Sequence, residues 1–487
     1  MEKRDRGLDR EVIREVENAY KTLPDFLKTE VLPSSEPISA YKMLSAYNML
    51  KYASANVPLY SKKPYLEAVN KAKNGDLEEI LKSTPIIDGS IFLSHYDDLI
   101  PLNKTPITVY FSSGSTGKPK PIPRTYDQDI DYARGFIKSV IYPVMPNGMD
   151  IEINKGPPLP AISGRLMSVI SMESKAIEFS QGPAQTIADL LRVIEKFDSN
   201  HSKNILMLGF PSAVIREIYN LNESDKNYLK DVVNKLNLYV LVGGETLPYQ
   251  RAKLLYNLLP SKTLIDFIGS SEGIVAYRVY TREELENDLV INKPFRFVSY
   301  NNLFMIKTGL NGAEKLLTPK EAVGLEGELV ITTKAREGAE YVPLINYNTK
   351  DLIKVTDVAE NGDIMGYYIG RADGIKRFGV GKLVEEMIVN TISDLINRYK
   401  VGEGYSVITR ENGLDKATFY LDRGQFSGDP EELTKTIKSS LSSAQMEIAY
   451  SLEKELATIH VELLNKDSIP FYKDRGKSKW LIDKREV

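Results

Sequence analysis

Short apolar runs alternate with helical patterns through the middle of the chain. Residues 205–208, 238–242 and 263–268 are apolar runs with the character of strands. Between the last two, residues 248–259 place leucines along one helical face. This alternation of strands and helices predicts a mostly parallel, doubly wound α/β core.

Two further patterns follow the core. Residues 290–357 contain shorter strands separated by polar turns, which predict a smaller β subdomain attached to the core. The last hundred-odd residues predict an α+β module, with helices and strands expected at 383–396, 405–409, 417–421, 429–442 and 459–464. We therefore expect a large domain over 1–370, a small domain over 374–487 and a hinge near 371–373.

The first 160 residues give weaker patterns. Amphipathic helices are expected over about 9–50. A helix is expected over 127–141, with Thr125 or Asp127 as its N-terminal cap. Residues 143–160 are rich in proline and glycine, so they predict an irregular loop.

Composition argues against several classes of protein and site. The 487-residue chain is 42% hydrophobic and 26% charged, as is usual for globular proteins. Its formal net charge of −3 gives no support for nucleic-acid binding, which favours a basic surface. The chain has no cysteine, and its three histidines are not at metal-ligand spacing. Disulfides, thiol chemistry and a histidine-rich metal site are therefore not expected. Because we find neither a secretory signal nor a membrane-spanning run, we expect a cytoplasmic protein.

One loop has the composition of a phosphate-binding site. It follows a strand-like run at 107–111 and contains Ser112, Ser113, Gly114, Ser115, Thr116, Gly117, Lys118 and Lys120. Glycines let the backbone close around an anion, hydroxyls and amides donate hydrogen bonds, and lysines add positive charge. The loop is not a Walker loop, because Pro119 follows Lys118 and Ser112 stands where the first glycine belongs. An ordinary surface loop is the alternative.

Two stretches downstream could serve the same ligand. The strand that ends in Gly269-Ser270-Ser271-Glu272-Gly273 offers a hydroxyl for a phosphate and a carboxylate for Mg²⁺, at the strand end where open sheets bind ligands. A helix start with a capping serine explains it equally well. The stretch from Asn346 to Asp351 offers a carboxylate for the two hydroxyls of a ribose. On that stretch alone, a polar turn is the favoured explanation.

Two later stretches are weaker still when taken singly. Glycines flank Arg371 and Asp373, and they allow the unusual backbone angles of a hinge. Residues 470–479 form a basic stretch that contains Lys477. A basic stretch near a chain end is usually a solvated tail.

Together, in this order and spacing, these stretches resemble the adenylate-forming, acyl-activating superfamily of acyl-CoA synthetases, peptide-synthetase adenylation domains and luciferases. The likeness covers about residues 105–480, from the phosphate loop to the late Gly-Lys. Ile268, Ser271 and Lys350 depart from the pattern, which often has an aromatic residue, a threonine and a glycine there. The short lead before the loop resembles the compact branch of phenylacetate-CoA ligases, acyl-protein synthetases and plant auxin-amide synthetases. The lack of cysteine argues against the acyl-protein route.

The resemblance implies roles for the candidate residues around one bound ATP. Ser112–Lys120 would bind the β- and γ-phosphates, Ser271 the α-phosphate and Glu272 the Mg²⁺ ion. Gly243, Gly244 and Glu245 would flank the adenine, and Asp351, with Arg371 beside it, would bind the ribose. Asp373 would be the hinge, and Lys477 would stabilise the charge that develops as the carboxylate attacks the α-phosphate. Attack of a carboxylate on a phosphate needs such cations and amides, because they offset the repulsion between two anions.

The expected reaction joins a small-molecule carboxylic acid to ATP, releasing pyrophosphate, and passes the acyl group to an acceptor. Coenzyme A is the expected acceptor and an amine the second choice, and the small domain is expected to rotate about Asp373 between the steps. No nucleic-acid partner is expected. The oligomeric state stays open, with a homodimer as one alternative. A degenerate nucleotide-binding protein is another class, and a P-loop kinase or NTPase is disfavoured by Pro119 and Ser112.

Overall fold

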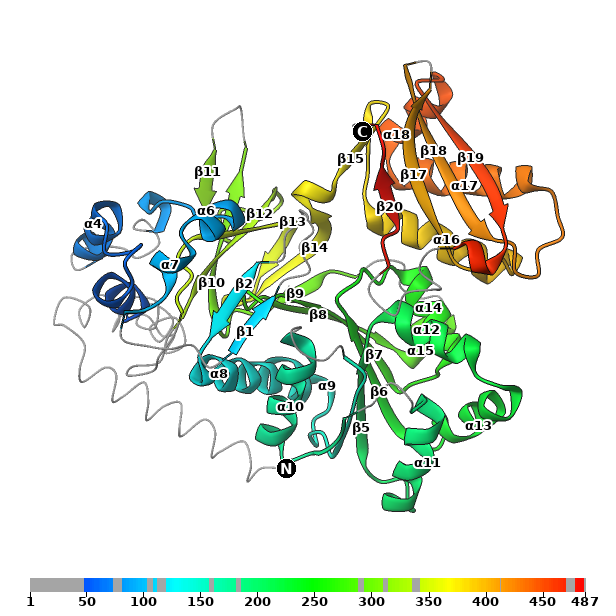
Figure 1. Ribbon diagram of the computed structural model, residues 1–487, viewed down its shortest axis with the longest axis horizontal. Coiled ribbons are helices and arrows are strands. Elements are labelled where there is room, and N and C mark those ends of the chain that lie inside the picture. Colours follow the sequence, from blue (N-terminus) through cyan, green and yellow to red (C-terminus); the bar gives the residue numbers. More distant parts are fainter. Residues whose placement is uncertain are drawn as a thin grey trace.

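A twelve-stranded mixed sheet runs through the larger part of the chain (Figure 1). The computed structural model describes residues 48–72, 81–102, 108–111, 120–156, 162–180, 185–287, 293–309, 314–334, 342–411, 413–469 and 478–485. The strand order is β11-β10-β12-β13-β14-β9-β8-β7-β6-β5-β3-β4. The expected helices over 9–50 lie almost entirely outside the described residues.

One half of this sheet is parallel, as the alternation predicts. Its strands are β4 (Ile177–Ser180), β3 (Ile151–Asn154), β5 (Asn204–Gly209), β6 (Asn237–Gly243) and β7 (Thr263–Gly269). The connecting helices are α10 (Ile162–Ser174), α11 (Ile187–Phe197), α12 (Pro211–Asn220), α13 (Glu223–Val233) and α14 (Tyr249–Leu258). The expected α/β fold class is confirmed.

Successive residues of the parallel strands feed two different cores. Ile205 and Met207 of β5 pack in the core that includes α11, α12 and α14. Leu206 and Leu208 pack with α10 and with the earlier helix α8 (Tyr126–Phe136). Because side chains alternate across a strand, continuous apolar runs bury both faces of the sheet under helices.

The other half of the sheet is antiparallel. It contains β8 (Val275–Thr281), β9 (Phe295–Phe297), β10 (Asn302–Thr308), β11 (Lys315–Leu317), β12 (Glu326–Thr333), β13 (Tyr347–Val358) and β14 (Ile364–Arg371), with α15 (Arg282–Asn287) after β8. The strands predicted for the smaller β subdomain therefore continue the same hydrogen-bonded sheet.

The segment from β1 to β3 differs in one place from the structure that the sequence predicts. β1 (Thr108–Phe111) and β2 (Pro121–Arg124) form an antiparallel pair around the predicted phosphate loop. Thr125, not Asp127, caps α8 in a capping box with Gln128. The loop expected over 143–160 is wrong in part, because it contains β3. Ile151 and Ile153 are fully buried in that strand, but four residues among prolines and glycines give too short a pattern to detect.

Three of the remaining early elements cover the antiparallel half of the sheet. They are α4 (Lys63–Ala72), α6 (Gly89–Ser94) and α7 (Tyr96–Leu99). After α8 come a π-helical turn, η1 (Ile137–Ile141), and α9 (Tyr142–Val144), which pack with α10 and with strands of the parallel half. Phe92 of α6 and Leu99 of α7 are buried in the core that contains Phe304, Leu329 and Ile353 of the sheet.

A separate small lobe follows β14 (Figure 1). After η3 (Ala372–Gly374) come β15 (Lys376–Phe378), β16 (Gly381–Leu383), α16 (Glu385–Tyr399), β17 (Gly404–Glu411), β18 (Leu414–Asp422), α17 (Pro430–Ala444), α18 (Met446–Glu453), β19 (Ala457–Leu464), η4 (Lys466–Ser468) and β20 (Leu481–Asp483). Its four-stranded sheet has the order β19-β18-β17-β20. The helices and strands predicted here are confirmed, while the domain boundary and the hinge stay predictions.

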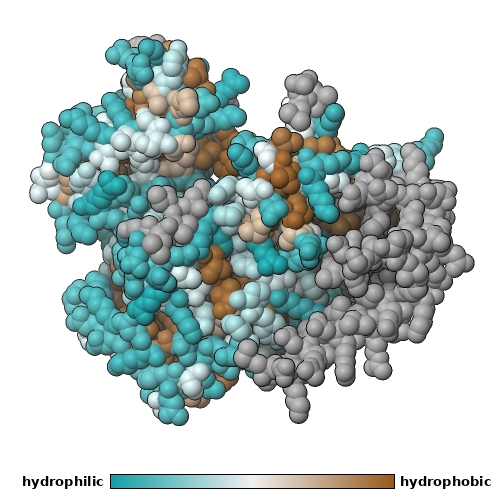
Figure 2. Space-filling view, turned by 180° about the vertical axis from the view of Figure 1, so that it is seen from behind, coloured by the Kyte–Doolittle hydropathy of each residue, from teal (hydrophilic) through white to brown (hydrophobic). Residues whose placement is uncertain are grey.

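The surface seen from behind is mostly hydrophilic, with hydrophobic side chains gathered in narrow bands (Figure 2). Among the described residues, no helix combines the length and apolar character needed to cross a membrane.

Candidate active site

The carboxyl ends of β6 and β7 meet at one edge of the sheet, where open α/β sheets bind ligands. A Cβ atom at Gly243 would lie 2.4 Å from the carbonyl oxygen of Phe267, so only glycine fits between these strand ends. Gly244 has φ +76°, in the left-handed region that glycine favours. The two predicted glycines therefore bring the backbone of one strand close to the other and then turn it away.

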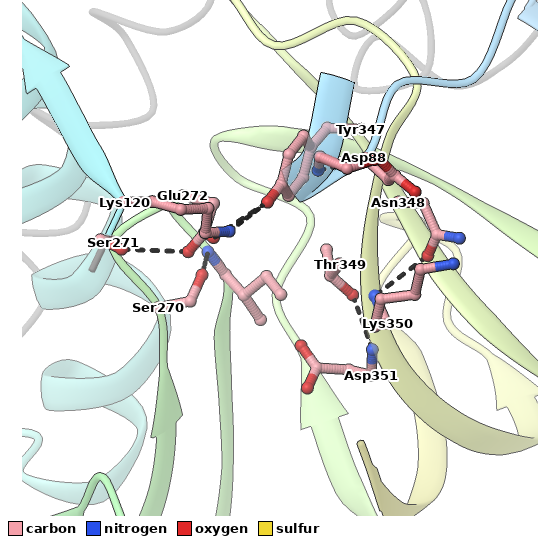
Figure 3. Close-up of polar contacts among 12 residues, drawn as sticks. Asp88, Lys120, Ser270, Ser271, Glu272, Tyr347, Asn348, Thr349, Lys350 and Asp351 are labelled. Atoms are coloured by element: carbon pink, nitrogen blue, oxygen red, sulfur yellow. Dashed lines mark hydrogen bonds and ion pairs between the residues drawn. The ribbon is translucent and has the colours of Figure 1, made fainter. Parts of the chain in front are cut away.

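A lysine, a glutamate and a tyrosine from three distant segments meet beside this edge (Figure 3). The Lys120 Nζ atom lies 2.7 Å from Glu272 Oε1 and donates a hydrogen bond to the Tyr347 hydroxyl at 2.5 Å. The Tyr347 hydroxyl lies 3.2 Å from Glu272 Oε1 and donates to it. Both charged side chains are largely buried. The structure thus joins the end of the predicted phosphate loop to the predicted metal ligand.

The charge of Glu272 depends on this lysine. Burial alone would raise the pKa of the Glu272 carboxyl, but the nearby Lys120 ammonium and the hydrogen bonds from Lys120, the backbone and Ser271 together outweigh burial, so the pKa is lowered. Burial, together with the charge of Glu272, raises the pKa of Tyr347, so its hydroxyl keeps its proton. Glu272 is therefore a carboxylate anion that could bind a metal ion or another cation.

Ser271 lies next to Glu272 and is buried. Its hydroxyl donates to Glu272 Oε2 at 3.1 Å, and Arg124 Nη1 donates to its carbonyl oxygen at 3.4 Å. Arg124 is itself paired with buried Asp129 at 2.9 Å. A buried ion pair between β2 and α8 thus supports the turn that carries the predicted α-phosphate contact.

Asp351 lies on β13 and points toward the side on which Ser270 and Glu272 lie (Figure 3). Burial raises the pKa of its carboxyl to about 6, although the charge of Arg371 opposes the rise. The Tyr368 hydroxyl donates to Asp351 Oδ1 at 3.1 Å. A carboxylate in this position could accept ribose hydroxyls, as the resemblance implies.

Lys350 adopts a backbone conformation that glycine favours. Its φ is +66°, in the left-handed region that disfavours residues with a Cβ atom. Two side chains hold the turn, because Asn348 Oδ1 accepts from the Lys350 N–H at 3.0 Å and Thr349 Oγ1 accepts from the Asp351 N–H at 3.1 Å. The departure at this position is therefore accommodated without moving the Asp351 backbone out of the strand.

Two other predicted residues have partners of their own. Arg371 pairs with Asp373 through two hydrogen bonds, at 3.0 and 3.1 Å, just after β14. Glu245 accepts from the Ser212 N–H at 3.1 Å and from the Ser478 N–H at 2.9 Å, so it joins α12 to the small lobe. The implied roles of Arg371, Asp373 and Glu245 stay predictions.

Several predicted residues lie outside the described part of the chain. They are Ser112, Ser113, Gly114, Ser115, Thr116, Gly117, Lys118 and Lys477. The structure describes their chain neighbours Phe111, Lys120 and Ser478.

Sequence reasoning missed three residues that the structure places in contact with predicted ones. Tyr347 and Tyr368 contact Glu272 and Asp351 through their hydroxyls. Ser478 contacts Glu245. Tyr347 lies inside a stretch that the sequence analysis singled out, whereas nothing in the sequence near Tyr368 sets it apart from other strand tyrosines.

Glu272 suits a role as a Mg²⁺ ligand. Mg²⁺ is usually held by one or two carboxylates together with substrate phosphates. Glu272 is ionised, and it lies beside the serine predicted to contact a phosphate. Among the described residues, no group of three or more histidine, cysteine, aspartate or glutamate side chains could hold a metal ion.

The comparisons with known proteins rest on structure. No family model and no curated protein sequence matches the chain. The 2-hydroxyisobutyryl-CoA ligase in its postadenylation state superposes with a TM-score of 0.62 at 16% identity, over 94% of this chain and 91% of the ligase. The open conformation of that ligase, in complex with 2-HIB-AMP and CoA, gives 0.51 at 16% identity, over 93% and 92%. The GH3.15 acyl acid amido synthetase in complex with 2,4-DB gives 0.60 at 12% identity, over 94% and 93%. The chain thus has the fold of the adenylate-forming enzymes.

Proposed function

We propose that the protein activates a carboxylic acid with ATP, forming an acyl-adenylate and pyrophosphate, and then transfers the acyl group to an acceptor with release of AMP. The observation that carries the proposal is the buried cluster of Lys120, Glu272 and Tyr347, with Ser271 beside it. The cluster lies beside the carboxyl ends of β6 and β7, in a chain that has the fold of the adenylate-forming enzymes.

The arrangement suits attack of a carboxylate on the α-phosphate of ATP. Two anions must approach each other, and fixed cations and amides lower the cost of that approach. Lys120 supplies one buried cation, and the Ser271 hydroxyl, which donates to Glu272 here, would turn to donate to an α-phosphate oxygen. Mg²⁺ held by Glu272 and the nucleotide would neutralise phosphate charge. Asp351 would orient the nucleotide through its ribose.

We expect coenzyme A as the acceptor. The CoA ligase and the amido synthetase give similar TM-scores, so the fold supports an amine equally. To identify the acceptor, coenzyme A or an amino acid is added to the enzyme together with its acid and ATP, and the acyl product is measured. A thioester supports the first choice and an amide the second.

The test of the proposal is acid-dependent exchange of labelled pyrophosphate into ATP across a panel of short hydroxy acids, aryl acids and fatty acids. Exchange that requires one of these acids is expected. The matched variants are Lys120→Ala, which removes a cation from the proposed site, and Lys82→Ala, which removes a cation from a surface pair with Glu321. Loss of exchange in the first and retention in the second would support the assignment.

A further inference from the structure

The small lobe rests on the two helices that follow β5 and β6 (Figure 1). Asn390 of α16 accepts from the Gln250 N–H at 3.3 Å, and Asn397 Nδ2 donates to the Gln250 carbonyl oxygen at 3.2 Å. Both contacts tie α16 to the start of α14. The lobe is therefore docked by specific polar groups in addition to apolar packing.

Glu245 bridges the two parts of the chain at this contact. Its Oε2 atom accepts from Ser212 at the start of α12, and its Oε1 atom accepts from Ser478 of the small lobe. Arg216 on α12 donates to the Ser478 hydroxyl at 3.1 Å. The backbone and the side chain of Ser478 are thus both held by the large part of the chain.

A buried ion pair anchors the same segment. Arg251 of α14 lies 2.5 Å from Glu403, which precedes β17 of the small lobe, and their side chains are 1% and 0% exposed. Trp480, two residues after Ser478, packs over the Arg251 guanidinium with its ring centroid 4.9 Å away. Arg251 also donates to the Ser212 hydroxyl at 3.3 Å.

These contacts share one property that apolar packing lacks. Docking the small lobe in a shifted position would leave Arg251 or Glu403 buried without its partner charge, and an unpaired buried charge is costly. Ion pairs of this kind add little net stability but select one arrangement over others. The Ser212–Glu245–Ser478 bridge has the same selectivity, because both N–H groups must face one carboxylate.

We propose that Glu245 is a positioning residue, and that with Arg251 and Glu403 it forms a latch that fixes the small lobe in the arrangement used for acyl-adenylate formation. This inference rests on the proposed function. It assigns Glu245 to lobe docking, with no direct contact to the nucleotide. The TM-score with the postadenylation state of the CoA ligase, 0.62, exceeds the 0.51 for the open conformation of the same ligase, which is the direction expected for a latched arrangement.

The absence of cysteine makes the docking measurable in the full chain. Ser224 on α13 and Ser439 on α17 are exposed residues of the large part and the small lobe. Ser224→Cys and Ser439→Cys together create the only two thiols, so paired labels report the distance distribution between the lobes. The labels go onto the wild-type background, Glu245→Ala, Glu245→Gln, Arg251→Met and the control Arg282→Met, which breaks an exposed pair with Glu286.

Three readouts separate positioning from folding and from nucleotide contact. We expect one narrow distance distribution in the wild type and in Arg282→Met, and a broadened one in Glu245→Ala and Arg251→Met. Acid-dependent pyrophosphate exchange should fall about 10- to 100-fold in these two variants, because misplaced groups lose catalysis steeply. The dissociation constant for ATP should stay within about twofold. Glu245→Gln, which keeps an acceptor oxygen, should recover part of the rate.

Two results would overturn the inference. One is a Glu245→Ala protein whose distance distribution matches the wild type. The other is a Glu245→Ala protein whose affinity for ATP falls as much as its exchange rate, which would make Glu245 a nucleotide contact. Melting temperatures identify variants that do not fold. If Arg251→Met is one of them, the Glu245→Ala and Glu245→Gln variants alone test whether the latch exists. If no acid supports exchange in the wild type, the proposed function fails, and the distance distributions alone still decide whether the latch exists.

Discussion

The Lys120 ammonium lies 2.7 Å from Glu272 Oε1, and the two side chains come from segments 152 residues apart. They are 16% and 12% exposed, so each charge is stabilised mainly by the other. The pair connects the loop between β1 and β2 to the turn after β7. It is the contact on which the proposed function depends most.

Removing the cation of this pair should destabilise the fold. Lys120→Met leaves Glu272 buried without its main counter-charge, and we expect a loss of about 2–4 kcal/mol in the free energy of unfolding. The double variant Lys120→Met with Glu272→Gln should recover most of that loss, because no buried charge remains unpaired. Denaturant titration measures both. A double variant as unstable as the single one would contradict this account.

Glu272→Gln alone should impair turnover as well as stability, because it also leaves the buried Lys120 ammonium without its counter-charge. It removes the anion proposed to hold Mg²⁺ and keeps an oxygen that can accept from Tyr347. We expect the Mg²⁺-dependent rate to fall at least about 100-fold, in the range seen when one electrostatic group of an active site is lost. Glu321→Gln, which changes a surface pair, serves as the control in a turnover assay with titrated Mg²⁺. Wild-type activity in Glu272→Gln would remove this residue from the site.

Nucleotide affinity should depend on pH through Asp351. Its pKa is raised to about 6, so the carboxylate becomes protonated as the pH falls through 6 and no longer attracts two ribose hydroxyls. The ATP affinity of the wild type relative to Asp351→Asn should therefore fall about tenfold per pH unit below 6. Calorimetry between pH 5 and 8 measures the ATP affinity of both proteins. Protonation of ATP itself changes both affinities equally, so it cancels in their ratio.

The Tyr368 hydroxyl sharpens this test. It donates to Asp351 Oδ1 and favours the charged carboxylate. Tyr368→Phe should raise the pKa of Asp351 further and move the loss of affinity to higher pH. A ratio that is flat across this range in the wild type would rule out Asp351 as the ribose contact.

The left-handed backbone at Lys350 should carry a measurable strain. Lys350→Gly and Lys350→Ala both remove the ion pair with Glu328, which spans 3.5 Å, but only glycine relieves the backbone. We expect the glycine variant to be more stable than the alanine variant by about 1 kcal/mol. Thermal denaturation of the two side by side measures this difference. Equal stabilities would show that the turn costs nothing.

Lys477 should serve acyl-adenylate formation. It is the counterpart of the late Gly-Lys of the adenylate-forming superfamily, and the next residue, Ser478, contacts Glu245. In Lys477→Ala we expect acid-dependent pyrophosphate exchange to fall at least about 100-fold, because a cation that stabilises the reacting anions is lost. Lys479→Ala, an exposed neighbour, is the control. Undiminished exchange in Lys477→Ala would remove its assignment.

Hydrophobic periodicity predicts the parallel core and the small lobe well. The runs at 205–208, 238–242 and 263–268 fall on β5, β6 and β7, because buried parallel strands are apolar on both faces. β3 was missed, because it has only four residues and includes the buried polar residues Glu152 and Asn154. No periodicity shows that β8 joins the antiparallel strands to the same sheet, since pairing between distant strands is a property of the folded chain.

The candidate site was predictable where a residue type carries its own chemistry. Ser271, Glu272 and Asp351 could be named because hydroxyls and carboxylates recur in phosphate, metal and ribose contacts. The pairing of Lys120 with Glu272 could not, because it depends on where β2 begins and β7 ends in space. The contact between Glu245 and Ser478 belongs to the same class, since lobe docking creates it.

The most direct test of the account is pyrophosphate exchange into ATP by the purified full chain, with and without each acid of the panel. The account predicts exchange that appears only with a suitable acid, requires Mg²⁺ and is lost in Lys120→Ala. A protein that binds ATP but exchanges no pyrophosphate with any acid, or that releases the γ-phosphate without an acid, would contradict it.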